Sequence, residues 1–312
     1  MALLREAGCE LSITESKHVR QNDALRRQLN GADAALAGPE PYNAAVLDSP
    51  EAAALKIISR WGVGYDAVDL AAATRLGVVV ANTPGLLNEA VADYAFALLL
   101  SLARRVHEVH ATIRNGGWQT MWGGDVAGKT LGVIGCGAIG SAVARRAQGF
   151  GMKLLGYDVV PGPQRSEFQF VPLDQLLAES DFISIHAALT PQNRGLIGEA
   201  QLRRMKRTAY LINTARGPLV DEAALVQALN EGAIAGAALD VFVEEPLPVS
   251  HPLRTAPNVL LSPHQSSFGR ETGGRVGLAA AQAIVDLMSG RKPASVVNAD
   301  VLHSPALRAR LV

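Results

Sequence analysis

Three closely spaced glycines constrain the fold of this chain more than any other feature. Gly135, Gly137 and Gly140 follow a short apolar run, and a stretch with helical spacing comes after them. Gly135 allows a tight turn out of a strand, and Gly140 lets the next helix pack closely against that strand. A second apolar run begins at Lys153 and ends in Asp158. The pattern predicts a strand, a helix and a second strand that lies parallel to the first.

The same residues have the chemistry of a dinucleotide site. Gly137 has no side chain, so a pyrophosphate can approach the backbone, and the free N–H groups at the helix start would hold the phosphates. Asp158 lies where a carboxylate accepts hydrogen bonds from the adenosine ribose. Because a carboxylate there repels a 2′-phosphate, the sequence predicts NAD rather than NADP. Arg165, which follows the acid, carries little weight against this choice.

Helices and strands alternate along most of the chain, which indicates an α/β fold built on parallel sheets. We expect a first group of strands at residues 11–13, 34–37, 56–58 and 78–81. The strands expected after the glycines are residues 131–134, 153–157, 182–186, 209–213, 237–241 and 259–261. The helices expected are residues 3–10, 22–29, 42–48, 69–75, 141–150, a long one at 88–114, and one at 271–288.

Composition narrows the class of protein. The chain has 312 residues, of which 48% are hydrophobic, which suffices for two domains with separate cores. Its formal net charge is zero, so neither a nucleic acid nor a membrane surface is the expected partner. Cys9 and Cys136 lie far apart and indicate no disulfide framework. Without a recognisable signal peptide or a long apolar run, the expected location is the cytoplasm.

Three residues that suit catalysis follow the late strands. Arg216, Glu245 and His264 come after the strands expected at 209–213, 237–241 and 259–261. Because ligands bind beyond the carboxyl ends of parallel strands, these side chains belong to one edge. Arg216 can grip a carboxylate or carbonyl oxygen with two N–H groups. His264 can transfer a proton near neutral pH, and Glu245 can hold its second ring nitrogen and favour the imidazolium.

The residue pattern leaves one alternative open and disfavours others. Glu244 competes with Glu245, and composition does not separate them. His107 and His110 share a helical face, but no third ligand is evident, so no metal site is expected. His186 ends a strand near the glycines and is expected to line a pocket rather than react. The histidines at 18, 251 and 303 carry no motif.

Four stretches together resemble the D-2-hydroxyacid dehydrogenases, and the resemblance covers nearly the whole chain. They are the glycines with Asp158, residues 213–222 (NTARGPLVDE), residues 238–246 (ALDVFVEEP) and residues 262–264 (SPH). Within that family, residues 60–69 and 82–85 look most like the phosphoglycerate dehydrogenases of serine biosynthesis and their close relatives. The resemblance implies a hydride transfer between NAD and a small 2-hydroxyacid or ketoacid.

The resemblance also implies an architecture. It predicts two Rossmann-like, doubly wound, parallel-sheet domains with an active-site cleft between them. Residues 1–82 with 268–312 would form the substrate domain, and residues 83–267 the NAD-binding domain. Because the match begins inside the family's first helix, the substrate domain is expected to lack its first strand. A homodimer through the NAD domain is expected, with the helix from residue 88 in the interface.

Roles for individual residues follow from the same resemblance. Catalysis would rest on Arg216, Glu245 (rather than Glu244) and His264. Backbone groups of Val63 and Gly64 would bind the substrate carboxylate, while Arg60 would contact a substrate phosphate. The NAD site would comprise Gly135, Gly137, Ala138, Ile139, Gly140, Asp158, Thr190, Ala215 and Asp240.

Several departures from the family pattern bear on the substrate. The segment 118–122 (WQTMW) has no basic residue where phosphoglycerate enzymes often carry one, although a dianion needs more than one cation. The first expectation is nevertheless 3-phosphoglycerate, and the runner-up is hydroxypyruvate or glyoxylate. A non-enzymatic protein that senses NAD is an alternative of another class. A third is an enzyme disabled by its short N-terminus, which would bind NAD without turnover.

Overall fold

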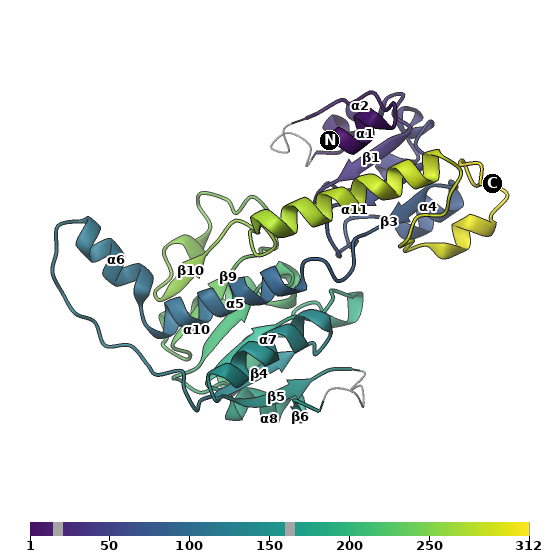
Figure 1. Cartoon of the computed structure of the whole chain (residues 1–312). Helices are drawn as coiled ribbons and strands as arrows, with labels where there is room; N and C mark the ends of the chain where they lie inside the picture. The colour runs from purple at the N-terminus through teal and green to yellow at the C-terminus, as the bar shows by residue number, and fades with distance from the viewer. Residues whose placement is uncertain (15–20, 160–165, 312) are drawn as a thin grey trace. The chain divides into compact units, whose positions relative to one another are not determined.

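The structure, a computed structural model, describes residues 1–14, 21–159 and 166–311, which form two compact units. Unit 1 comprises Met1–Leu87 with Arg270–Val312, and unit 2 comprises Asn88–Gly269 (Figure 1). Each unit contains one sheet in which all the paired strands are parallel. The predicted fold class, α/β with parallel sheets, is therefore confirmed.

Unit 2 is built on a seven-stranded sheet in the order β10-β9-β8-β7-β4-β5-β6. The chain starts at β4 in the middle, moves outward to β6, and then returns to β7 on the other side of β4. The chain reverses direction between β4 and β7, and ligands of open sheets bind at the carboxyl ends of strands beside such a reversal. The strands are β4 (Thr130–Ile134), β5 (Lys153–Tyr157), β6 (Gln169–Phe170), β7 (Phe182–Ile185), β8 (Tyr210–Asn213), β9 (Gly236–Leu239) and β10 (Val259–Leu261).

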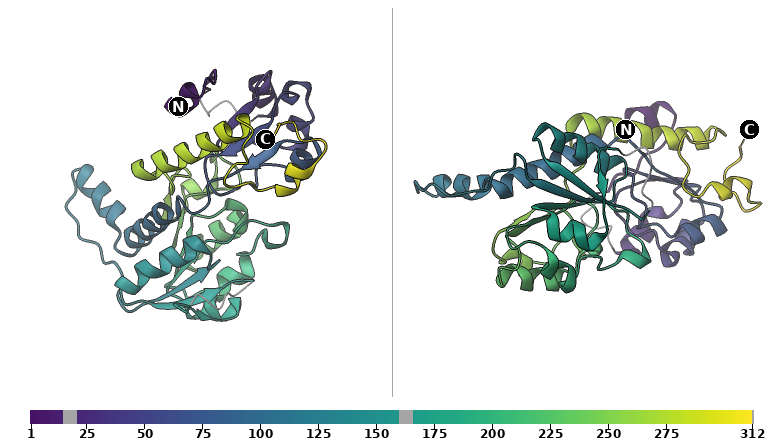
Figure 2. Two further views of the ribbon diagram at one scale, coloured as in Figure 1. Left: turned by 45° about the vertical axis from the view of Figure 1, so that its right-hand side comes forward. Right: turned by 90° about the horizontal axis from the view of Figure 1, so that it is seen from below.

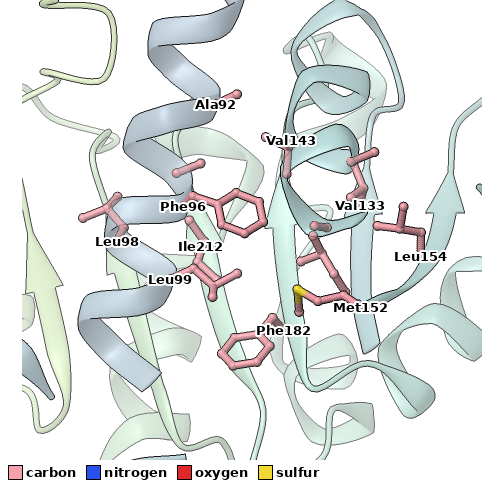
Figure 3. Close-up of a cluster of buried hydrophobic side chains, with 14 of the residues drawn as sticks. Ala92, Phe96, Leu98, Leu99, Val133, Val143, Met152, Leu154, Phe182 and Ile212 are labelled. Carbon is pink, nitrogen blue, oxygen red and sulfur yellow. The ribbon is translucent and has the colours of Figure 1, made fainter. Parts of the chain in front are cut away.

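Helices cover both faces of this sheet, so its central strands are apolar on both sides. On one face, Phe96 and Leu99 of α5 pack with Val143 of α7 and with Ile212 of β8 (Figure 3). On the other face, a second core gathers side chains of α8, α9 and α10 around residues such as Ile183. The helices of unit 2 are α5 (Asn88–Ala103), α6 (Val106–Arg114), α7 (Ala138–Gly149), α8 (Leu173–Glu179), α9 (Glu199–Arg204) and α10 (Glu222–Asn230).

Unit 1 has a three-stranded sheet in the order β1-β2-β3, whose side chains alternate between two cores. Ile58 and Val80 face one core, whereas Ile57 and Val79 face the other. This alternation follows from the two-residue period of a strand. The elements are α1 (Ala2–Glu6), α2 (Asn22–Leu29), β1 (Ala34–Ala37), α3 (Ala44–Leu47), β2 (Ile57–Arg60), α4 (Leu70–Arg75), β3 (Val79–Ala81) and α11 (Arg270–Met288).

The late part of the chain is an integral part of unit 1. Ala281 and Ile284 of α11 pack in the core that contains Ile57. Asn298 bonds both to the N–H of Val80, at 2.8 Å, and to the carbonyl of Val78, at 2.9 Å. Unit 1 is therefore assembled from both ends of the sequence, as Figure 2 shows by the yellow helix beside the purple strands.

The prediction of one long helix at residues 88–114 is wrong, because the structure has two helices there, α5 and α6. Arg105 lies in the left-handed region with φ 53°, and it precedes α6. The carbonyl of Ala103 accepts a hydrogen bond from the N–H of Gly124 at 2.8 Å, so a distant loop ends α5. The guanidinium of Arg105 then binds both carboxylate oxygens of Glu108 at 2.8 and 2.6 Å. No glycine or proline marks this break in the sequence.

Two further differences concern strands. The structure adds β6, a two-residue edge strand that the sequence prediction did not include. Residues 11–13 are not a strand, and Ile13 is exposed.

Among the residues that the structure describes, no helix has both the length and the apolar character that crossing a bilayer requires.

Candidate active site

The predicted site residues of unit 2 lie at one edge of its sheet, where the parallel strands end. The glycines follow β4, Asp158 follows β5, and His186 follows β7. Arg216 and His264 come after β8 and β10, respectively. Since β10, β9 and β8 are neighbours, the loops that carry the acid–base residues are also neighbours.

Each glycine of the loop has a different structural reason. Gly135 has φ 89°, and a Cβ there would lie 2.4 Å from the backbone nitrogen of Ala187. At Gly140, a Cβ would lie 2.2 Å from the carbonyl oxygen of Gly135, which no side chain could tolerate. At Gly137, a Cβ would have no neighbour within 4 Å. The loop therefore keeps open space at the one glycine where the backbone must meet a ligand.

The start of α7 supplies the donors for that space. Ala138 and Ile139 are the first residues of the helix, and amides in a first turn have no partner in the helix itself. Ala138 is exposed and Ile139 is half-buried. Asp158 closes the loop, because its Oδ2 accepts a hydrogen bond from the N–H of Cys136 at 2.9 Å. A carboxylate can accept several bonds, so Asp158 can also receive ribose hydroxyls. These features fit an adenine dinucleotide.

The acid–base pair is formed in the structure. Nδ1 of His264 lies 2.9 Å from Oε2 of Glu245, and the side chains are 36% and 17% exposed. Oε1 of Glu245 accepts a hydrogen bond from the N–H of Phe242 at 3.1 Å. This contact orients the imidazole and leaves Nε2 as the ring nitrogen for a substrate. Glu244 is exposed, and its neighbour Glu245 makes the contact that the sequence pattern left open between them.

His264 has a strained backbone that the surrounding turn stabilises. Its φ of 56° is unusual for a residue with a side chain. Its N–H donates to the carbonyl of Asp240 at 2.7 Å. The carboxylate of Asp240 accepts from the hydroxyl of Ser262 at 2.6 Å and from the N–H groups of Gln265 and Ser266 at 2.7 and 2.8 Å. Asp240, expected to contact NAD, is fully buried and holds the turn that carries His264.

Asn213, for which the sequence pattern predicted no role, shapes the loop of Arg216. Its Nδ2 donates to the carbonyl of Arg216 at 2.8 Å, and its Oδ1 accepts from the N–H of Ala215 at 3.0 Å. Next to them, a Cβ on Gly217 would lie 2.0 Å from the carbonyl carbon of Phe242. The loop after β8 thus rests directly on the loop after β9. Two features of the sequence could have indicated this role: Asn213 is a polar residue at the end of a strand, and Gly217 follows Arg216 directly.

Two other residues named in the sequence analysis, His186 and Thr190, follow β7. Thr190 is exposed and begins a short turn, in which its N–H donates to Oδ1 of Asn193 at 2.7 Å. His186 has its Nε2 2.8 Å from the hydroxyl of Ser184. Loss of solvent around the ring lowers the pKa of His186 to about 3. The ring is therefore neutral at physiological pH, which makes it unsuitable as a general acid.

The predicted substrate-binding residues lie in unit 1. Nε of Arg60 donates to the carbonyl of Gly64 at 3.0 Å, and the carbonyl of Val63 accepts from Asn82 at 2.9 Å. Arg60 is only 7% exposed. Its observed contact braces the loop from residue 61 to residue 64. Substrate binding by these residues stays a prediction.

Other candidates gain no support as reactive groups. His107 has its Nδ1 3.3 Å from the carbonyl of Ser101, and His110 is exposed. Within residues 1–14, 21–159 and 166–311, no three histidine, cysteine or carboxylate side chains are grouped as metal ligands would be. His18 and Arg165 lie outside the described residues.

Comparisons with known proteins agree with this geometry. Residues 96–266 match the family model described as D-isomer specific 2-hydroxyacid dehydrogenase, NAD binding domain. The chain is 47% identical to a glyoxylate reductase of Korarchaeum cryptofilum, over 84% of this chain and 81% of the relative. It is 42% identical to a glyoxylate reductase of Thermofilum pendens, over 97% and 92%. The crystal structure of the TT0316 protein from Thermus thermophilus is similar, with a TM-score of 0.85, 41% identity and coverage of 94% of both chains.

Proposed function

The chain belongs to the D-isomer specific 2-hydroxyacid dehydrogenases, and we propose that it is a glyoxylate reductase, which converts glyoxylate to glycolate with NADH. The observation on which the proposal rests is the contact between His264 and Glu245 in the NAD-binding unit.

We assign the proton transfer to His264. Bound NADH supplies the hydride for the carbonyl carbon of the substrate. The proton for the carbonyl oxygen comes from Nε2 of His264, since Nδ1 faces Glu245. Glu245 stabilises the imidazolium and keeps the ring in one orientation, because its other oxygen is held by the N–H of Phe242.

Arg216 is assigned to binding the substrate. A guanidinium can donate two parallel hydrogen bonds to a carboxylate, or one to the carboxylate and one to the carbonyl that is reduced. Asn213 and Ala215 fix the backbone of its loop. An arginine held in this way favours a substrate whose carboxylate lies directly beside its carbonyl group, which is the definition of a 2-oxoacid.

Two observations favour an unphosphorylated substrate over the phosphoglycerate first expected from the sequence. The relatives at 47% and 42% identity are named glyoxylate reductases. Arg60, the residue expected to bind a phosphate, is buried and donates to the carbonyl of Gly64. Glyoxylate has one carboxylate and needs no second cation. Hydroxypyruvate is the closest alternative, since it differs by a hydroxymethyl group.

We also propose that two copies associate through unit 2. Trp118 and Trp122 are 90% and 97% exposed, and none of the α6 side chains is buried. Figures 1 and 2 show α6 and the segment after it projecting from the rest of unit 2. Isolated exposure of two tryptophans is unfavourable in water, and aromatic residues are enriched in protein interfaces. We call α6 and the segment after it, to Trp122, the arm of unit 2. Its exposed apolar side chains would be covered if the arms of two copies packed against each other.

NADH oxidation by the purified protein at neutral pH tests the proposed reaction. We expect turnover with glyoxylate to exceed turnover with hydroxypyruvate and, by a wide margin, with phosphohydroxypyruvate. His264→Ala should lower kcat by on the order of 10²–10⁴ through lost proton transfer, whereas His303→Ala, at an exposed position of unit 1, should not.

Preference for phosphohydroxypyruvate would contradict the substrate assignment. NADH binding without turnover on any 2-oxoacid would favour the non-enzymatic, NAD-sensing alternative. A near-normal kcat in His264→Ala would remove His264 from the mechanism and leave the family assignment intact.

A further inference from the structure

We propose that Glu222 and His251 are positioning residues that hold the segment of Glu245 in its active geometry. This inference rests on the proposed roles of Glu245 and His264. It concerns two residues that lie outside the predicted site, at the start of α10 and in the loop after β9. Neither is proposed to touch the substrate or the cofactor.

Glu222 reaches from α10 to the loop of Glu245. Its Oε1 accepts a hydrogen bond from the backbone N–H of Val243 at 2.8 Å. The side chain of Glu222 is only 11% exposed, whereas Val243, the donor of this bond, lies at the surface. An acid in the first turn of a helix usually interacts with its own helix amides. Here one carboxylate oxygen instead binds a residue 21 positions away in the sequence.

The backbone around Val243 links Glu222 to the acid–base pair. The preceding N–H, that of Phe242, donates to Oε1 of Glu245. Two consecutive amides are therefore held by two different carboxylates, and the second carboxylate faces His264. The Val243 side chain is 57% exposed, so little apolar packing holds this position. The hydrogen bond to Glu222 holds the N–H side of the peptide between residues 242 and 243.

The backbone of Gly217 packs against the carbonyl side of the same peptide. Gly217 approaches the carbonyl of Phe242 so closely that a Cβ would lie 2.3 Å from the carbonyl oxygen. Glu222 and Gly217 therefore hold the peptide from two directions. Because the backbone of Gly217 blocks movement on its side, the bond to Glu222 controls movement of the peptide toward the segment of Glu245.

His251 completes the arrangement by orienting Glu222. Its Nε2 lies 3.3 Å from Oε2 of Glu222, and its Nδ1 accepts a hydrogen bond from the N–H of Leu253 at 3.3 Å. A ring nitrogen that accepts carries no proton, so the proton resides on Nε2 and points at Glu222. The turn that starts at His251 thus selects the tautomer that binds the carboxylate.

A purely structural role for Glu222 and His251 makes different predictions from a positioning role. A structural role would lower stability and leave the chemistry of folded protein unchanged. A positioning role acts through Glu245, so its loss should matter only while Glu245 is present. The two can be separated by a double-mutant cycle.

The experiment compares Glu222→Ala, Glu222→Gln and Glu245→Gln, with Glu231→Ala as a control at the exposed end of the same helix. Turnover is measured with the best 2-oxoacid substrate, and NADH affinity and the urea midpoint are measured in parallel. We expect Glu222→Ala to lower kcat about tenfold or more and to change NADH affinity less than twofold. Glu222→Gln keeps an oxygen for the N–H of Val243 but turns an NH₂ group toward Nε2–H of His251, so it should recover part of the loss. His251→Ala should change kcat in the same direction as Glu222→Ala, but less.

In the Glu245→Gln background, Glu222→Ala should have no additional effect on kcat. A full additional tenfold loss in that background would overturn the inference. So would a kcat in Glu222→Ala equal to that of Glu231→Ala.

A readout independent of turnover separates this inference from the proposed function. The proton on Nδ1 of His264 gives a downfield NMR signal when it is bonded to Glu245, and His264→Gln identifies that signal. We expect Glu222→Ala to shift or abolish it and Glu222→Gln to restore it. An unchanged signal in Glu222→Ala would overturn the positioning role, whether or not the protein reduces glyoxylate.

Discussion

His186 shows how one buried side chain can couple stability to pH without taking part in catalysis. Its pKa is about 3 in the folded protein, against 6.5 as the ordinary value, because burial disfavours the charged ring. Between these two values the unfolded chain binds a proton that the folded chain does not. Stability contributed by this residue is therefore present at neutral pH and is lost as the pH falls below 6.5.

We expect the wild-type protein to lose about 2 kcal/mol of unfolding free energy through His186 between pH 7 and pH 5. His186→Gln cannot bind that proton, so its stability should fall less over the same interval. Urea unfolding of both proteins at the two pH values measures the difference. Equal losses in the two proteins would mean that the ring binds a proton as readily in the folded chain as in the unfolded chain.

At the scale of elements, the sequence predicted best where one local pattern determines the outcome. The apolar run at residues 153–157 is β5 with the predicted bounds, and the glycines after β4 are placed as their spacing required. The failures depend on contacts between distant parts of the chain. The end of α5 is set by the bond between Ala103 and Gly124, and no local pattern indicates it.

The same distinction applies to the site. Sequence order placed Arg216, Glu245 and His264 after neighbouring strands, because parallel strands end at one edge. The choice between Glu244 and Glu245 depends on which of the two side chains faces His264. That direction is set by the conformation of the loop after β9 and cannot be read from the residue types. The partners of Asp240 could not be predicted either. Two of the three hydrogen bonds to its carboxylate come from backbone amides, which every residue type except proline provides.

The turn after β10 yields a prediction for Asp240. In Asp240→Asn, one acceptor oxygen becomes an NH₂ group, which must face a backbone N–H of Gln265 or Ser266. A buried donor without a partner costs about 1–3 kcal/mol, and the turn of His264 should loosen.

Urea unfolding should show that loss of stability, and hydrogen exchange should accelerate at residues 265 and 266. Asp300→Asn, on an exposed turn of unit 1, is the control. An unchanged urea midpoint in Asp240→Asn would show that the turn finds another acceptor.

At the scale of the whole molecule, the projecting arm of unit 2 determines the expected assembly. We predict that replacing both Trp118 and Trp122 by serine shifts the protein from dimer toward monomer, because the proposed interface loses its largest apolar side chains. Sedimentation velocity at several protein concentrations measures the shift.

Val249→Ser is the matched control for that experiment, since Val249 is 90% exposed on another loop of unit 2. If the double tryptophan variant sediments like the wild type, the arm is not the interface. A similar shift in Val249→Ser would mean that the effect is not specific to the two tryptophans.

The discontinuous construction of unit 1 also has a consequence for the nascent chain. Ribosomal synthesis releases β1, β2 and β3 early, but α11, which packs in the same core as Ile57 and Val79, begins only at Arg270. At about 5–20 residues per second, that apolar face stays uncovered for on the order of ten seconds. All of unit 2 emerges during this interval and can fold as one uninterrupted segment. Chaperones that bind exposed apolar strands therefore have most opportunity at unit 1, whose first strands are made early and covered last.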